Sequence, residues 1–145
     1  MSRPLLDVNV VIALLDASHL FHARAHAWWG EHQKGGWASC PLTENGVVRV
    51  MSQPAYSRQV TFSIPQLIHA LTTFRKQTDH QFWSDDLSLI DSETFDGRYL
   101  LSPRQVTDVY LLGLAVRHEG RLATFDHAIP WAAVRGAQAD HLCIL

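Results

Sequence analysis

Short apolar runs alternate with longer amphipathic stretches along this chain, and this alternation restricts the possible folds more than any other feature. The runs at residues 3–6, 37–40, 121–125 and 142–145 are predicted as strands, and 81–83 with 87–89 as one interrupted strand. The stretches between them have helical spacing and are predicted as helices at residues 8–15, 21–32, 41–52, 64–77 and 103–118. Apolar strands that alternate with helices form parallel sheets covered on both faces. We therefore predict an α/β fold with a short, mostly parallel sheet of four or five strands.

Length and composition agree with one domain spanning residues 1–145. A chain of 145 residues buries enough surface to fold without disulfides or structural metals. Its 47% hydrophobic and 18% charged residues exclude a disordered chain and a membrane protein. No apolar window approaches the roughly 18 residues of a membrane span, which predicts a cytoplasmic protein without membrane contact. Cys40 and Cys143 are too few for a disulfide framework or a cysteine zinc site.

Four acidic side chains stand at informative positions. Asp7 and Asp126 follow apolar strands directly, where open α/β sheets bind ligands, although an Asp there can also be a helix cap. Asp108 is the single charge in the apolar helix VTDVYLLGLAV, so its carboxylate needs a cation as partner. Glu44 lies in the first turn of its helix, where the helix dipole alone would favour a negative charge. The pattern S-P-R-Q at Ser102 predicts a capping box that starts the helix of Asp108.

Converging carboxylates repel one another unless a cation lies between them. Mg²⁺ and Mn²⁺ prefer carboxylate and water oxygens, so such a site predicts one of these ions. His22 and His26 are four residues apart on one helix but have no third ligand in the sequence, which favours an ordinary surface helix over zinc. The chain also has no phosphate-binding glycine loop and no nucleophile elbow.

The motifs that carry the four acids occur in the order LLDVN, LTENGVVRV, VTDVYLLGLA and RLATFD. In this order they resemble PIN-domain ribonucleases, specifically the VapC-type toxins of bacterial toxin–antitoxin pairs. The resemblance covers essentially the whole chain, including the segment FWSDDLSLID. It implies a PIN-like domain and an endoribonuclease that hydrolyses phosphodiester bonds in RNA with Mg²⁺ or Mn²⁺. The RNA that such a toxin cuts is expected to be structured, such as tRNA or rRNA.

The resemblance also assigns roles to residues of this chain. Asp7, Glu44 and Asp108 match the three core metal-binding acids, and Asp126 matches the fourth, more variable one. All four are therefore expected to be catalytic. The small polar residues that often support the site match Asn9 and Thr124.

Substrate and partner contacts are expected around these positions. Arg49, Arg104 and His127 lie close in sequence to the acids and could contact RNA phosphates. Family members dimerise and bind an antitoxin that covers the site, so a homodimer and a cognate antitoxin are expected. The helix with Trp28 and Trp29 is a candidate for such a contact, or else belongs to the core.

Two alternatives remain open at this point. A DxN sequence after a strand is also typical of phosphotransferases with an aspartyl nucleophile, but these need a late cationic partner, usually lysine, and the chain has only Lys34 and Lys76. The other alternative is a non-catalytic PIN fold that only binds RNA or an antitoxin. The formal charge of −2 argues against bulk electrostatic binding of RNA. If four of the fourteen acidic residues belong to one site, however, ten acidic residues remain against twelve Lys and Arg, so the rest of the protein is mildly basic.

Overall fold

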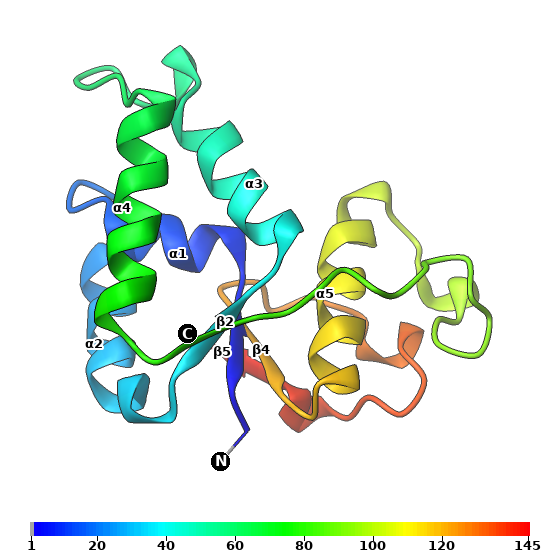
Figure 1. Ribbon diagram of the computed structural model, residues 1–145. Coiled ribbons are helices and arrows are strands. Elements are labelled where there is room, and N and C mark those ends of the chain that lie inside the picture. The colour runs from blue at the N-terminus through cyan, green and yellow to red at the C-terminus, as the bar shows by residue number, and fades with distance from the viewer. Residues whose placement is uncertain (1) are drawn as a thin grey trace.

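The computed structural model describes residues 2–145 and contains the predicted alternation of strands and helices (Figure 1). The strands are β1 (Pro4–Leu6), β2 (Trp37–Ser39), β3 (His80–Phe82), β4 (Arg121–Thr124) and β5 (Leu142–Ile144). The helices are α1 (Val8–Leu15), α2 (His22–His32), α3 (Pro41–Met51), α4 (Ile64–Gln77) and α5 (Val106–Arg117). These bounds lie close to the predicted ones, so the predicted succession of elements is confirmed for these segments.

The five strands form one parallel sheet in the order β3-β2-β1-β4-β5. In the register of the central pair, Leu5 lies opposite Leu122 and Leu6 opposite Ala123. The connection after β1 runs to one side of the sheet, and the later strands β4 and β5 lie on the other side of β1. The strand order therefore reverses between β1 and β4, and such a reversal leaves a crevice at the carboxyl ends of the two strands.

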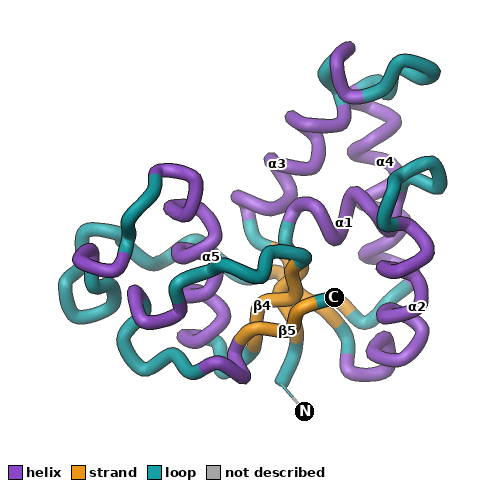
Figure 2. The backbone as a smooth tube through the Cα atoms, turned by 180° about the vertical axis from the view of Figure 1, so that it is seen from behind, coloured by secondary structure: helices purple, strands orange, loops and turns teal. Residues whose placement is uncertain are grey.

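Both faces of the sheet are covered, as the apolar strands predict (Figure 2). Leu5 and Leu122 belong to the core that includes α5, whereas Leu6 and Ala123 belong to the core that includes α1 to α4. Successive strand residues point to opposite faces, so a strand buried on both faces needs an unbroken apolar run. The α/β class with a parallel sheet is confirmed.

The predicted interrupted strand is wrong in its second half. The edge strand β3 ends at Phe82, and residues 87–89 form a loop. The amide of Trp83 still donates to the Ser39 carbonyl at 2.8 Å, but Asp85 then accepts from the Leu42 amide at 3.1 Å and draws the chain toward α3. Leu87 and Leu89 pack on the core from this loop, so their apolar character reports burial rather than strand pairing.

The predicted capping box at Ser102 is also wrong. Residues Pro103–Gln105 form a 3-10 turn, and the Ser102 hydroxyl accepts from the Arg104 amide at 3.3 Å instead of the amide three residues on. The side chain of Gln105 reaches across to the Ala128 carbonyl, 3.5 Å away. The tighter turn delays the start of α5 to Val106, which leaves Asp108 in its first turn.

The two tryptophans of α2 contribute to the core between α1 and α4. Trp28 is buried and stacks on His32, and the partly buried Trp29 packs on Phe74. No helix within residues 2–145 has the length and apolar character needed to cross a membrane.

Candidate active site

Three aspartates meet at the crevice between β1 and β4. Asp7 follows β1 directly, Asp126 lies two residues beyond β4, and Asp108 approaches from the first turn of α5. Together with Asn9 and Thr124 they line a pocket of about 280 Å³. The structure brings these three aspartates to one pocket, because the carboxyl ends of neighbouring parallel strands lie at one edge of the sheet.

Asp7 is held in place by hydrogen bonds to both of its carboxylate oxygens. Oδ1 accepts from the Val8 amide at 2.7 Å, which caps α1, and Oδ2 accepts from the Thr124 hydroxyl at 2.8 Å. Thr124 Oγ1 in turn accepts from the Asp126 amide at 3.1 Å. The buried Thr124 therefore links the two aspartates that follow β1 and β4.

Each carboxylate at the site makes ionisation of its neighbours less favourable. Burial, followed by the charges of Asp7 and Asp126, raises the pKa of Asp108 to about 7. Burial also raises the pKa of Asp7, against the opposing hydrogen bonds from Thr124 and Val8. The site therefore holds more negative charge than its surroundings stabilise, and a cation would relieve this.

The donor set of the three aspartates fits a hard divalent cation. Within residues 2–145, no three His, Cys, Asp or Glu side chains are arranged closely enough to hold an ion as they stand. Mg²⁺ does not require such a cage, because it keeps several water ligands and uses only one or two carboxylates. Asp7, Asp108 and Asp126 are therefore the side chains that could bind such an ion here.

Glu44 lies apart from the three aspartates. Its Oε2 accepts from the Ser39 hydroxyl at 2.5 Å and is 3.4 Å from Nη1 of Arg75 on α4. The pocket of the aspartates does not include Glu44 among its lining residues, whereas the cleft between α3 and α4 does. The structure thus brings together three of the four predicted acids and directs the fourth toward α4.

Sequence reasoning missed the polar network that holds Glu44. His80 Nε2 lies 2.7 Å from Ser39 Oγ, and burial and the nearby Arg75 lower the pKa of His80 to about 4. Since the single Ser39 hydroxyl proton is directed to Glu44, neutral His80 donates its Nε2 proton to Ser39. Ser39 and His80 come from neighbouring strands and Arg75 from α4, so no local motif in the sequence links them.

The predicted substrate contacts are divided between two adjoining pockets. Arg49 lines the aspartate pocket, and Arg104 lines a neighbouring pocket of about 440 Å³ that shares Asp108 and Asp126 with it. Neither arginine has a carboxylate partner among residues 2–145. His127 is exposed and is not among the residues that line either pocket.

The lysine that a phosphotransferase would need is not at the site. Lys34 lies in the turn after α2 and Lys76 near the end of α4, and neither lines the pocket of Asp7. The pocket therefore has three carboxylates that could bind a divalent cation, without the lysine expected beside an aspartyl nucleophile.

Comparison with known proteins decides the family. No protein-family model matches the chain. Over 143 residues, 99% of both sequences, it is 49% identical to Ribonuclease VapC44 of Mycobacterium tuberculosis. The chain belongs to the VapC family of PIN-domain ribonucleases. Two further VapC relatives from the same organism are Ribonuclease VapC39, 40% identical over 91% of this chain and 94% of the relative, and Ribonuclease VapC38, 42% identical over 86% of each. The resemblance predicted from the motifs is confirmed, and with it the enzyme class.

Proposed function

We propose that this VapC protein is the endoribonuclease toxin of a type II toxin–antitoxin pair. In this proposal it hydrolyses phosphodiester bonds in RNA with Mg²⁺ or Mn²⁺. The observation that carries the proposal is the convergence of Asp7, Asp108 and Asp126, with a raised pKa at Asp7 and Asp108, in a chain of this family.

Asp7, Asp108 and Asp126 would hold the ion. When bound, a divalent ion supplies positive charge that acidifies a water molecule and offsets charge on the leaving oxygen. Asp7 is already fixed by Val8 and Thr124, so it contributes an oriented ligand. Asp126 is held less tightly than Asp7: its Oδ1 accepts from the Ala128 amide at 2.8 Å, and its side chain interacts with that of Asp108. Asp126 would bind the ion or orient the attacking water.

Two arginines would position the RNA. Arg49 and Arg104 line two different pockets that share Asp108 and Asp126, and both guanidinium groups are without a carboxylate partner within residues 2–145. Guanidinium groups bind phosphate oxygens in a bidentate manner. RNA phosphates near the aspartates would thus have two cations available to bind them. Asn9, which lines the pocket, remains a predicted supporting residue of the site, and the exposed His127 remains a predicted substrate contact.

The role of Glu44 as a metal ligand stays a prediction. Its Oε2 accepts from Ser39 and is paired with Arg75, so this oxygen is already engaged away from the aspartates. The Glu44→Gln variant tests this. A ligand role predicts a loss of Mn²⁺ affinity as large as that of the aspartate variants, and a supporting role in α3 predicts little loss.

Partners and location complete the proposal. We propose a cognate antitoxin that covers the aspartates, a homodimer, a structured RNA such as tRNA or rRNA as substrate, and a cytoplasmic location. These follow from membership of the family and from the predicted role as a toxin.

The deciding experiment compares Asp108→Asn with a matched control. We expect Asp108→Asn to lower Mg²⁺-dependent cleavage of RNA by at least about 100-fold and to weaken Mn²⁺ binding in calorimetric titration. Asp140→Asn makes the same chemical change on a carboxylate that is 84% exposed and remote from the pocket, and it should leave both quantities unchanged. A folded Asp108→Asn protein that cuts RNA at the wild-type rate would refute the proposal. Mn²⁺ binding without RNA cleavage by the wild-type protein would favour the binding-module alternative.

A further inference from the structure

The aspartate pocket continues into a longer groove. It shares Arg49 with a cleft of about 640 Å³ between α3 and α4, whose size is within the range of small-molecule sites. That cleft shares Thr72 and Arg75 with a further pocket of about 370 Å³, which is lined in addition by Lys76 and His80. Pockets that share lining residues adjoin one another, so one groove leads from the aspartates along α4 to the edge of the sheet.

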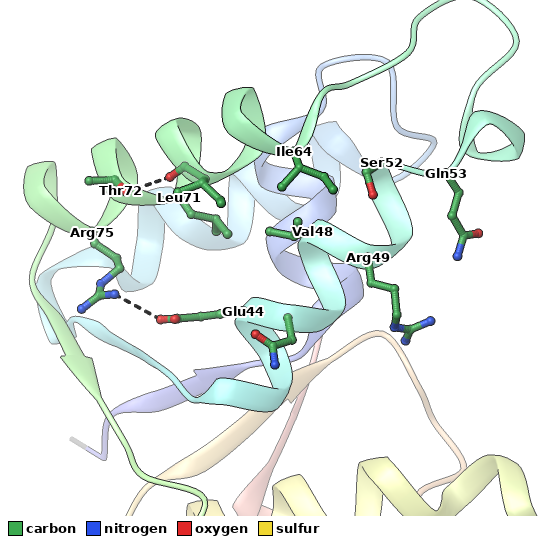
Figure 3. Close-up of a pocket in the computed structure, with 11 residues that line it drawn as sticks. Glu44, Val48, Arg49, Ser52, Gln53, Ile64, Leu71, Thr72 and Arg75 are labelled. Atoms are coloured by element: carbon green, nitrogen blue, oxygen red, sulfur yellow. Dashed lines mark hydrogen bonds and ion pairs between the residues drawn. The ribbon is translucent and has the colours of Figure 1, made fainter.

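Cationic side chains recur along this groove. Arg104 and Arg49 lie in the pockets of the aspartates, and Arg75 and Lys76 lie at the far end. Figure 3 shows Arg49 and Arg75 at opposite ends of the cleft, with apolar side chains between them. Beyond the three aspartates, the carboxylate that lines these four pockets is Glu44. The groove away from the metal-binding side chains is therefore net positive.

The walls between the cations are apolar and open to solvent. Ile64 and Ile68 of α4 are each 53% exposed and face Val48 of α3 across the cleft. At the far end, Phe82 is 48% exposed, and the guanidinium carbon of Arg75 lies 5.8 Å from the centre of its ring. Cations for phosphates and an exposed aromatic ring for base stacking are the features by which proteins bind single-stranded nucleic acid.

We propose that a single-stranded segment of the RNA runs from the aspartates past Arg49, through the α3–α4 cleft, to Arg75, Lys76 and Phe82. This inference rests on the proposed function, because it takes RNA as the substrate of the aspartate site. It assigns binding of the substrate beyond the scissile phosphate to residues that contact no metal.

Charge and continuity favour RNA over a protein segment in this groove. An RNA strand held at the aspartates must leave them on one side, and the groove past Arg49 begins in the same pocket. A polyanion also matches cations at intervals, whereas the apolar cleft alone would suit any amphipathic peptide. Binding of a peptide in place of RNA is therefore the alternative outcome of the test.

The test measures RNA affinity and its salt dependence with a charge-matched control. The probe is a fluorescein-labelled, mixed-sequence single-stranded RNA of roughly 10 nucleotides, a length within the site sizes of single-strand-binding folds. The Arg75→Gln/Lys76→Gln double variant is compared with Arg24→Gln/Lys34→Gln, which removes the same charge from exposed positions on and after α2. Binding is followed by fluorescence anisotropy with Ca²⁺ in place of Mn²⁺, another hard cation with oxygen ligands, and gel electrophoresis checks that the probe stays intact during the titration.

Loss of two phosphate contacts should lower the slope of log affinity against log salt by about 1.4. Over a fourfold change in salt concentration, this change of slope alters the RNA affinity by about sevenfold. The control should keep the wild-type slope. Because Arg75 is paired with Glu44, Lys76→Gln alone is the second variant, and its slope should fall by about 0.7. Phe82→Leu should weaken binding at least about fivefold without a change of slope.

Unchanged affinity and slope in the groove variants would overturn the proposal, and an amphipathic peptide that binds the wild-type protein without displacing the RNA would then favour a protein segment as the occupant of the cleft. Equal losses in the groove variants and the control would overturn it as well, since the effect would then be bulk charge. Failure of the proposed function is distinguishable from both outcomes. In that case RNA cleavage is not seen even in the wild-type protein, whatever the groove variants do to RNA binding.

Discussion

The replacement Asp108→Asn should stabilise the metal-free protein at neutral and higher pH. Asp108 is partly buried beside Asp7 and Asp126, and its charge is disfavoured by both burial and repulsion. An Asn side chain has nearly the same shape and no charge. The change thus removes a destabilising charge, which an ion at the proposed site would compensate.

The magnitude follows from the pKa of Asp108. A rise from 3.8 to about 7 corresponds to about 4 kcal/mol if the whole difference between folded and unfolded states is counted. Water reaches part of the Asp108 side chain and screens its neighbours, so we expect about 1–2 kcal/mol. For a domain of this length that is an increase in melting temperature of about 3–6 °C.

The sign of the pH dependence separates this cause from a change in packing. A carboxyl group with a raised folded-state pKa destabilises the fold fully above that pKa, and the effect fades as the pH falls toward the unfolded-state value. The gain for Asp108→Asn should therefore be complete near about pH 8 and should fade as the pH falls toward about 3.8, the unfolded-state value.

Thermal unfolding followed by circular dichroism, with a chelator or with Mn²⁺, measures these differences. With Mn²⁺ at about 100 times its dissociation constant, the wild-type protein gains about 2.7 kcal/mol and becomes the more stable of the two. The control Asp140→Asn should shift neither curve by more than about 0.5 kcal/mol. A metal-free Asp108→Asn protein that is less stable than wild type near pH 8, or equally stabilised at both pH values, would refute the reasoning.

Three further predictions concern the site and its support. Thr124→Val should destabilise the fold by about 1–3 kcal/mol in urea titrations and weaken Mn²⁺ binding, since the Thr124 hydroxyl bonds to two aspartates. Gly46→Ala should lower the free energy of unfolding by about 1–3 kcal/mol in the same assay, because the new Cβ would lie 2.6 Å from Cγ2 of Val8. Gly30→Ala is the control: its new Cβ would have no neighbouring atom within 4 Å, so it should raise the free energy of unfolding by about 0.5–1 kcal/mol. In calorimetry, Mn²⁺ affinity should fall by up to about tenfold for each pH unit below about 7, because binding needs the ionised form of Asp108.

The sequence is most informative where the chemistry is local. Apolar strands such as 3–6 and 121–125 are recognisable because a parallel strand is buried on both faces and has no polar alternation. The meeting of Asp7 and Asp126 then follows from the strands being parallel. Asp108 is identified by being a single charge on an apolar helix. These inferences need only the neighbouring residues and the rules of sheet architecture.

Features that depend on how distant elements pack could not be predicted in this way. The direction of Glu44 is set by Arg75, which lies 31 residues later on α4, and by Ser39 on β2. The cleft between α3 and α4 has the same origin, since it exists only once both helices are in place. Burial of Leu87 in a loop shows the related ambiguity that an apolar residue reports burial and not the backbone conformation around it.

The position of Glu44 also changes the charge balance of the site. With Glu44 paired to Arg75, the aspartate pocket carries three carboxylates rather than four. A single divalent ion would bring three ionised carboxylates to a net charge of −1, and Arg49 and Arg104, which line the pockets of these aspartates, would then make the surroundings of the site net positive. Without the ion, Asp108 is about half protonated at neutral pH, so the aspartates and the two arginines nearly cancel. We therefore expect RNA affinity at this site to rise when the ion binds, because only the ion makes the local potential clearly positive.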